Sequence, residues 1–220
     1  NFDEIVSAKT LYNYIDQGLL RVKNIDLPLR VRRKRKLSRL RKHRRCYGES
    51  IDERPVDVES RETFGHWEID TVIGSADSSE VLLTLDERMT RKRHIVKLPA
   101  KTAKAVEEGL KQVRKEYGKA WSKVFRTITC DNGSEFSSLP ELFTDTKIYY
   151  AHPYSAWERG TNEKQNSLIR RFFPKGKSFT SVSEKAISLV EDWINNLPRK
   201  FLEYHSPDEV FNSVLFDLAI

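Results

Sequence analysis

The sequence predicts an α/β domain with a mixed five-stranded sheet flanked by helices, preceded by an N-terminal helical and basic arm. Apolar, β-branched runs of strand length alternate with segments whose apolar residues recur every three or four positions, which predicts the domain. A cluster of Lys and Arg early in the chain predicts the arm. The apolar content of 38% is enough for a core, and no apolar run is long enough to span a membrane.

The N-terminal arm combines one helix with a strongly basic run. A helix is predicted at residues 7–15, and Gly18 ends it. Residues 30–45 contain 11 Lys or Arg and no Asp or Glu, so that the net charge of +7 becomes −4 without them. This local charge predicts sequence-independent binding to phosphates; a solubility tail or a targeting signal is the alternative. Residues 51–63 are predicted to be an extended linker, and the compact domain is predicted to begin near Thr63.

The first half of the domain is predicted to contain three strands and then a helix. Residues 67–73, 81–85 and 94–98 are rich in apolar and β-branched side chains, and the first two runs are predicted to pair as a hairpin. The helix is predicted at residues 103–117, where five apolar side chains at spacings of three and four form one face.

The second half of the domain continues the alternation. A strand is predicted at residues 124–130, a short helix at 139–143 and a fifth strand at 147–150. Three further helices are predicted at residues 161–172, 183–196 and 207–218. This order of elements is that of the ribonuclease H-like fold, and the strand pairing is taken from that analogy.

Three carboxylates stand at rigid positions of these predicted elements. Asp70 lies inside the first strand, Asp131 follows the fourth strand, and Glu163 lies in the first turn of the next helix. Three separated carboxylates that converge can bind a pair of divalent metal ions and cut or join phosphodiesters. The alternatives are a turn role for Asp131, which precedes Asn-Gly, and a helix-dipole role for Glu163. Asp70 is harder to explain otherwise, because a carboxylate in an apolar strand needs a partner, a metal or a proton.

Three segments resemble a known family. They are Gly-His-Trp-Glu-Ile-Asp-Thr-Val-Ile-Gly at 65–74, Thr-Cys-Asp-Asn-Gly-Ser-Glu-Phe at 129–136 and Pro-Tyr-Ser-Ala-Trp-Glu-Arg-Gly-Thr-Asn-Glu at 153–163. They are similar to the signatures of bacterial insertion-sequence transposases with a DDE catalytic core, in particular the insertion sequence thirty family. The resemblance implies four regions: the remnant of a helix-turn-helix unit, a basic arm and linker, an integrase-type catalytic core and a C-terminal helical extension, at residues 1–28, 29–62, 63–197 and 198–220.

The resemblance assigns the catalytic triad to Asp70, Asp131 and Glu163, and the same three residues as ligands of Mg²⁺ or Mn²⁺, with two ions expected. Hard oxygen ligands and the absence of a His or Cys cluster agree with these metals. Thirty-one residues separate Asp131 from Glu163, slightly fewer than is usual in the wider superfamily. Glu158 and Glu135 are the competing third carboxylates.

By the same resemblance, the chain cleaves DNA at the ends of a mobile element and transfers the freed 3′-hydroxyl strand into target DNA. Double-stranded DNA is the expected partner, a homodimer or larger assembly is expected on it, and the expected location is the cytoplasm. A catalytically silent DNA-binding remnant and a related nuclease of the same fold are the alternatives. The residues expected to contact DNA are Arg30, Arg32, Arg33, Lys34, Arg35, Lys36, Arg39, Arg41, Lys42, Arg44, Arg45, Lys164, Arg170 and Arg171.

Overall fold

The structure is a computed structural model that describes residues 6–27, 47–75, 77–152 and 160–218, with the side chains of residues 25 and 160–164 left out. The chain divides into two units, Asn1–His43 and Arg44–Ile220. The basic run at residues 30–45 lies outside the described residues, and so does Glu158. None of the helices within the described ranges is both long and apolar enough to cross a membrane.

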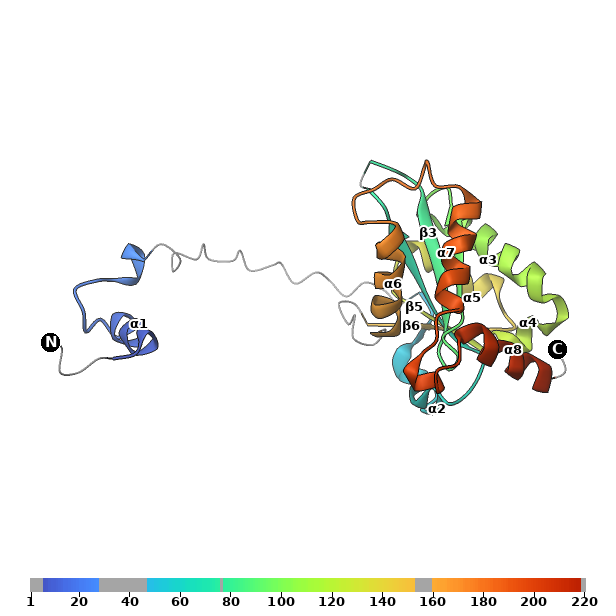
Figure 1. Ribbon diagram of the computed structural model, residues 1–220, viewed down its shortest axis with the longest axis horizontal. Helices are drawn as coiled ribbons and strands as arrows, with labels where there is room; N and C mark the ends of the chain where they lie inside the picture. Colours follow the sequence, from blue (N-terminus) through green and yellow to red (C-terminus); the bar gives the residue numbers. More distant parts are fainter. Residues whose placement is uncertain (1–5, 28–46, 76, 153–159, 219–220) are drawn as a thin grey trace. The chain divides into compact units, whose positions relative to one another are not determined.

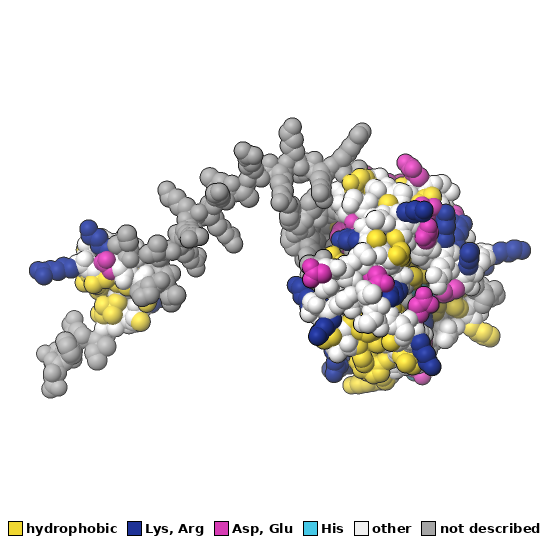
Figure 2. All heavy atoms as spheres, turned by 90° about the horizontal axis from the view of Figure 1, so that it is seen from above, with side chains coloured by type: hydrophobic (Ala, Val, Ile, Leu, Met, Phe, Trp, Pro, Cys, Tyr) yellow, Lys and Arg dark blue, Asp and Glu magenta, His cyan; other side chains and the backbone are white. Residues whose placement is uncertain are grey.

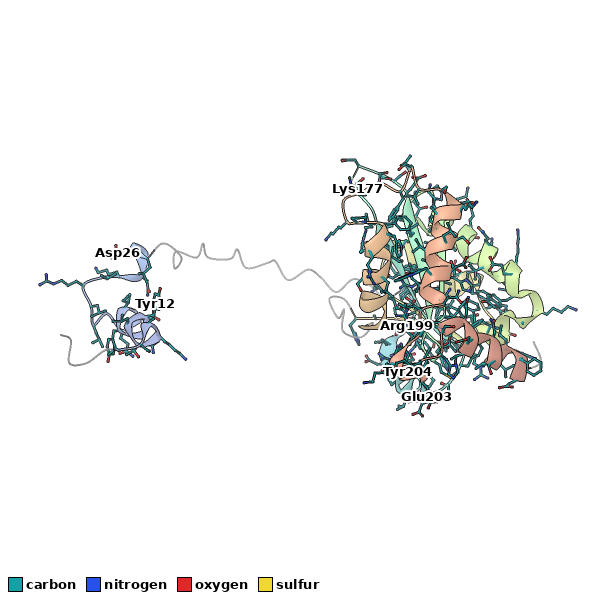
Figure 3. The ribbon with its side chains drawn as sticks, viewed as in Figure 1. Tyr12, Asp26, Lys177, Arg199, Glu203 and Tyr204 are labelled. Carbon is teal, nitrogen blue, oxygen red and sulfur yellow. The ribbon has the colours of Figure 1, made fainter. Side chains whose placement is uncertain are left out.

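The first unit contains the predicted helix. Helix α1 (Ala8–Asp16) begins after Ser7, whose hydroxyl accepts a hydrogen bond from the backbone N–H of Thr10 and so caps the helix. The chain then turns at Gly18, which has a φ of 71°. A short 3-10 turn, η1 (Asn24–Asp26), follows. Tyr12 and Asp26 mark this unit in Figure 3, and Tyr12 is 47% exposed, so the helix has no apolar face buried within the described unit.

The second unit is built on one mixed sheet. Its strands are β1 (Glu49–Ser50), β2 (His66–Ile73), β3 (Val81–Glu87), β4 (Arg93–Leu98), β5 (Thr127–Cys130) and β6 (Lys147–Tyr150). Their order across the sheet is β1-β6-β5-β2-β3-β4. The predicted hairpin is confirmed, since β2 and β3 pair antiparallel from Trp67–Glu87 to Ile73–Val81. On its other side β2 pairs in parallel with β5, which makes β2 an interior strand of the sheet.

Within the described residues the sheet has six strands, so the prediction of five was wrong. The additional strand, β1, pairs in parallel with β6 at the edge of the sheet. The segment predicted to be an extended linker instead forms η2 (Ile51–Glu53) and α2 (Asp57–Ser60), and Val58 is buried. Elements of two to four residues are too short to show an apolar repeat, so the alternating charges and Pro55 of this segment indicated a linker.

A second difference concerns the start of β5. The predicted strand began at residue 124, but α4 (Trp121–Val124) occupies the positions before it and β5 begins at Thr127. The rings of Trp121 and Phe125 stack with centroids 3.9 Å apart, and Phe125 stacks in turn on Trp67 of β2. Aromatic packing from the tertiary structure therefore decides a boundary that local β propensity could not.

Helices cover both faces of the sheet (Figure 1). Because side chains alternate along a strand, Ile69 and Leu83 point to the face covered by helix α3, and Val72 and Leu82 point to the opposite face. The opposite face is covered by helices α6 and α7. The helices of this unit beyond α2 and α4 are α3 (Ala103–Tyr117), α5 (Leu139–Leu142), α6 (Gly160–Phe172), α7 (Glu184–Asn195) and α8 (Pro207–Asp217).

Local sequence accounts for where the long helices begin. Thr102 caps α3, Ser183 caps α7, and Ser206 with Glu209 forms a reciprocal capping box at the start of α8. The apolar stripe of α3 is buried against the sheet, with Val106 and Leu110 fully covered. The predicted helices at 103–117, 161–172, 183–196 and 207–218 are therefore confirmed to within one or two residues.

Candidate active site

Asp70 lies on β2 and faces the side of the sheet covered by α6. It shares that side with Glu68 and Val72, and its side chain is half-buried. The Asp70 Oδ2 atom accepts a hydrogen bond of 2.9 Å from the Nδ2 atom of Asn166 on α6. A carboxylate in an apolar strand requires a partner. For Asp70 one partner is the side-chain amide of Asn166, 96 residues further along the chain.

Asp131 follows directly after β5, the parallel neighbour of β2. The register pairs His66 with Thr127 and Glu68 with Thr129. The paired register ends at this point, and Asp70 and Asp131 each follow two residues later along the two neighbouring strands. The parallel pairing therefore leads both chain segments toward the same edge of the β2–β5 pair, which is what the prediction of a shared site requires.

The Asn-Gly sequence after Asp131 shapes the loop around its carboxylate. The Oδ1 atom of Asp131 accepts a hydrogen bond of 3.1 Å from the backbone N–H of Gly133. A Cβ atom at Gly133 would lie 2.8 Å from that oxygen and 2.6 Å from the Oε2 atom of Glu135, so a side chain there would displace one or both carboxylates. Asp131 therefore takes part in a turn, as the alternative interpretation expected, and the hydrogen bond of that turn holds one of its carboxylate oxygens in place.

Glu135, a competing third carboxylate, is tied to other groups. It is buried, it forms an ion pair of 3.0 Å with Lys101, and it accepts a hydrogen bond of 3.3 Å from Thr71. Thr71 points to the opposite face of the sheet from Asp70, because adjacent residues of a strand alternate. These contacts give Glu135 a structural role beside the loop of Asp131.

The third predicted carboxylate, Glu163, lies in the first turns of α6, but its side chain is not among those described. It precedes Asn166 by three positions, and residues three apart share one face of a helix. Among the side chains that are described, no group of three or more His, Cys, Asp or Glu could hold a metal ion. The choice between Glu163 and Glu158 stays a prediction.

A layer of buried charges lies beside Asp70 on the same face, and the sequence analysis missed it. Glu68 is fully buried and forms an ion pair with Arg88, and burial raises the pKa of Glu68. Arg54, in the segment predicted to be a linker, donates a hydrogen bond of 3.1 Å to Thr129. The alternation of Glu68 and Asp70 along one strand was the available signal, because two carboxylates on one covered face need partners.

Two of the three predicted DNA contacts on α6, Arg170 and Arg171, have partners within the protein. The Nη2 atom of Arg170 donates a hydrogen bond of 2.7 Å to the backbone oxygen of Ile73, and burial lowers the pKa of Arg170. The guanidinium of Arg171 lies over the ring of Trp193, 5.5 Å from its centroid. The side chain of Lys164 is not described. Basic and acidic side chains are interspersed over the visible face of this unit in Figure 2.

Comparison with known proteins decides the family. The chain is 43% identical over 211 residues to the probable transposase for insertion-like sequence element IS1161 of Streptococcus salivarius, covering 94% of this chain and 59% of that relative. It is 34% identical over 165 residues to the transposase InsI for insertion sequence element IS30A of Escherichia coli, covering 74% of this chain and 42% of that relative. The chain belongs to the insertion-sequence transposase family.

Another relative agrees: the transposase for insertion sequence element IS4351 of Bacteroides fragilis is 41% identical over 171 residues, which are 75% of this chain and 50% of that relative. This transposase chain thus spans only about half the length of its curated relatives. No protein-family model matches it. The catalytic core domain of BIV integrase superposes with a TM-score of 0.55 and 17% identity, covering 72% of this chain and all of that domain. The predicted ribonuclease H-like fold is confirmed by this likeness.

Proposed function

We propose that this chain carries the catalytic core of a DNA transposase, which cleaves strands at the ends of an insertion sequence and transfers the freed 3′-hydroxyl strand into target DNA. The observation that supports the proposal is the parallel pairing of β2 and β5, whose last paired residues, Glu68 and Thr129, each lie two positions before Asp70 and Asp131. Carboxyl ends of adjacent parallel strands form a rigid base for a site. The catalytic triad of the proposal is Asp70, Asp131 and Glu163.

The chemistry of these residues fits divalent metal ions. Asp70 and Asp131 supply hard oxygen donors, both side chains are half-buried, and an N–H of Asn166 or Gly133 orients one oxygen of each. These two residues and Glu163 would hold Mg²⁺ or Mn²⁺. When bound, such ions activate a water or a 3′-hydroxyl and stabilise the leaving 3′-oxygen. The role of the chain itself would be to orient these carboxylates toward a common site.

Double-stranded DNA is the proposed partner, and the basic run at residues 30–45 supports it. Eleven positive charges over sixteen residues would bind phosphates without regard to sequence, with an affinity that falls steeply as salt rises. Because both ends of an element must be joined, we infer that a homodimer or a larger assembly acts on DNA. Arg171 adds a cation near the C-terminal end of α6, the helix of the third carboxylate.

A nicking and strand-transfer assay on labelled duplex DNA with Mg²⁺ or Mn²⁺ tests the proposal. Asp131→Asn should lower the cleavage rate by more than about 100-fold while DNA binding is kept, because the charge that holds the metal is lost and the fold is not. Asp145→Asn is the matched control, since Asp145 pairs with Arg114 at the surface and precedes β6 at the end that pairs with the start of β5, whereas Asp131 follows the end of β5. Equal cleavage by the wild type and Asp131→Asn would overturn the proposal.

The same assay separates the alternatives. Binding of DNA without nicking in either metal would favour a catalytically silent remnant. Preference for an RNA–DNA hybrid over duplex DNA would favour a nuclease of the same fold. Glu163→Gln and Glu158→Gln, compared side by side, identify the third carboxylate: retained cleavage in the first together with loss in the second would assign the role to Glu158.

A further inference from the structure

Asn166 connects Asp70 to a buried ion pair between Arg93 and Asp86, which lies on the same face of the sheet. Its Nδ2 atom donates to the Oδ2 atom of Asp70 over 2.9 Å, and its Oδ1 atom accepts from the Nη2 atom of Arg93 over 3.0 Å. A guanidinium has only donors and an ionised carboxylate only acceptors. The amide of Asn166 can therefore make both bonds in one orientation only, with the nitrogen toward Asp70.

Arg93 is a rigid anchor for this amide. Its side chain is completely buried, and it forms a two-pronged ion pair with Asp86 of β3, with Nε–Oδ1 and Nη2–Oδ2 distances of 2.6 and 2.5 Å. The backbone N–H and C=O of Arg93 are both bonded over 2.8 Å to the side-chain amide of Asn195 on α7. Asp86 and Asn195 are buried as well, so the anchor has little freedom to move.

We propose that Asn166 is a positioning residue, which holds the Asp70 carboxylate at the rotation that a divalent cation requires by linking it to the Arg93–Asp86 pair. The proposal rests on the proposed function. The terminal torsion of an Asp side chain is broad and two-fold, so an unsupported carboxylate samples many orientations. A hydrogen-bond donor that is itself held in place selects one of these carboxylate orientations. Hydrogen bonds that a metal ligand receives from neighbouring residues change metal affinity by about 10- to 100-fold.

Gln165, next to Asn166 on α6, provides a comparison, because its side-chain amide has a structural role. Gln165 is more deeply buried than Asn166, and it contacts the backbone oxygen of Arg91 and the guanidinium of Arg199 over 3.4 and 3.5 Å. Arg199, labelled in Figure 3, belongs to the segment after α7 and bonds the backbone of Ile194 as well. Gln165 therefore ties α6 to other parts of the protein through Arg91 and Arg199 rather than through Asp70.

Binding of Mn²⁺ to the full chain, followed by the electron paramagnetic resonance signal of the free ion, tests the proposal without relying on activity. The site is defined as the Mn²⁺ that the wild type binds and Asp131→Asn does not. Asn166→Leu keeps the side-chain volume and removes both hydrogen bonds, and it should weaken that binding by about 10- to 100-fold. Gln165→Leu is the control, and it should lower the melting temperature while leaving Mn²⁺ affinity unchanged.

The outcomes distinguish this inference from the proposed function. Wild-type Mn²⁺ affinity in Asn166→Leu, with binding still lost in Asp131→Asn, overturns the positioning role and leaves the transposase site standing. Equal weakening by Asn166→Leu and Gln165→Leu also overturns it, because the effect would then be general loss of structure. Failure of the wild type to bind more Mn²⁺ than Asp131→Asn overturns both. If Asn166→Leu does not fold, Asn166→Ser is read in the same way, since a short hydroxyl cannot bridge both partners.

Discussion

Replacing Arg93 by Met should destabilise the second unit strongly. Arg93 and Asp86 have no exposed side-chain area, and the substitution removes two hydrogen bonds to Asp86 and one to Asn166. Asp86 would be left as a buried charge without its cation. Breaking a buried pair from one side costs about 3–5 kcal/mol, because the desolvation of the remaining ion is no longer offset.

The assay is urea unfolding followed by tryptophan fluorescence, since Trp67 and Trp121 are fully buried and report on the core. With a urea dependence of roughly 2 kcal/mol per molar, a loss of 3–5 kcal/mol lowers the midpoint by about 1.5–2.5 M. The double variant Asp86→Leu with Arg93→Met should be more stable than the sum of the two single losses predicts, because it leaves no unpaired ion.

Arg114→Met is the matched control. Arg114 forms the same two-pronged bond with Asp145, over 3.1 and 2.7 Å, but both side chains are more than one third exposed. Arg114 also lies over the ring of Trp121, so its loss should cost no more than about 1–1.5 kcal/mol in total. A cost of Arg93→Met below about 1 kcal/mol, or simple additivity in the double variant, would refute the reasoning.

Two further predictions concern the loop of Asp131 and the response to acid. Gly133→Ala should lower DNA cleavage more than about tenfold with little change in melting temperature, since the nearest atoms that the added Cβ displaces belong to the carboxylates of Asp131 and Glu135 and not to apolar core side chains; wild-type cleavage rates would contradict this. Burial lowers the pKa of His66 in the folded protein. As the pH drops below about 6.5, the unfolded chain therefore takes up a proton at His66 before the folded chain does, and the free energy of unfolding falls. His66→Gln should lose less stability than the wild type between about pH 7.5 and 5.5, measured as the shift in urea midpoint; identical shifts would contradict it.

Segments with long, regular patterns were predicted well. The apolar face of α3 recurs over four turns, and β2 and β3 are long runs of apolar and β-branched residues with a short connection. Such patterns report burial directly, because an amphipathic helix or a covered strand has one stable way to hide its apolar side chains. The helix caps at Thr102, Ser183 and Ser206 are also local features, and their positions follow from a few adjacent residues.

Short elements and polar contacts were not predictable in the same way. The strand β1 has only two residues, and it exists because β6 offers it an edge about 100 residues later in the chain. The bonds from Asn166 to Asp70 and to Arg93 join residues 96 and 73 positions apart. No local pattern marks these partners, since a buried polar group is recognised only once the elements that cover it are assembled.

The sequence by itself determined the order of the longer elements, the family and the positions of Asp70 within β2 and of Asp131 directly after β5. These depend on periodicity and on motifs of adjacent residues. Only the tertiary structure decided that β5 pairs in parallel with β2, that Glu135 contacts Lys101 and Thr71, and that Asn166 is held by the Arg93–Asp86 pair. The physical reason is that strand register and charge pairing are set by contacts between distant segments, which exist only in the folded chain.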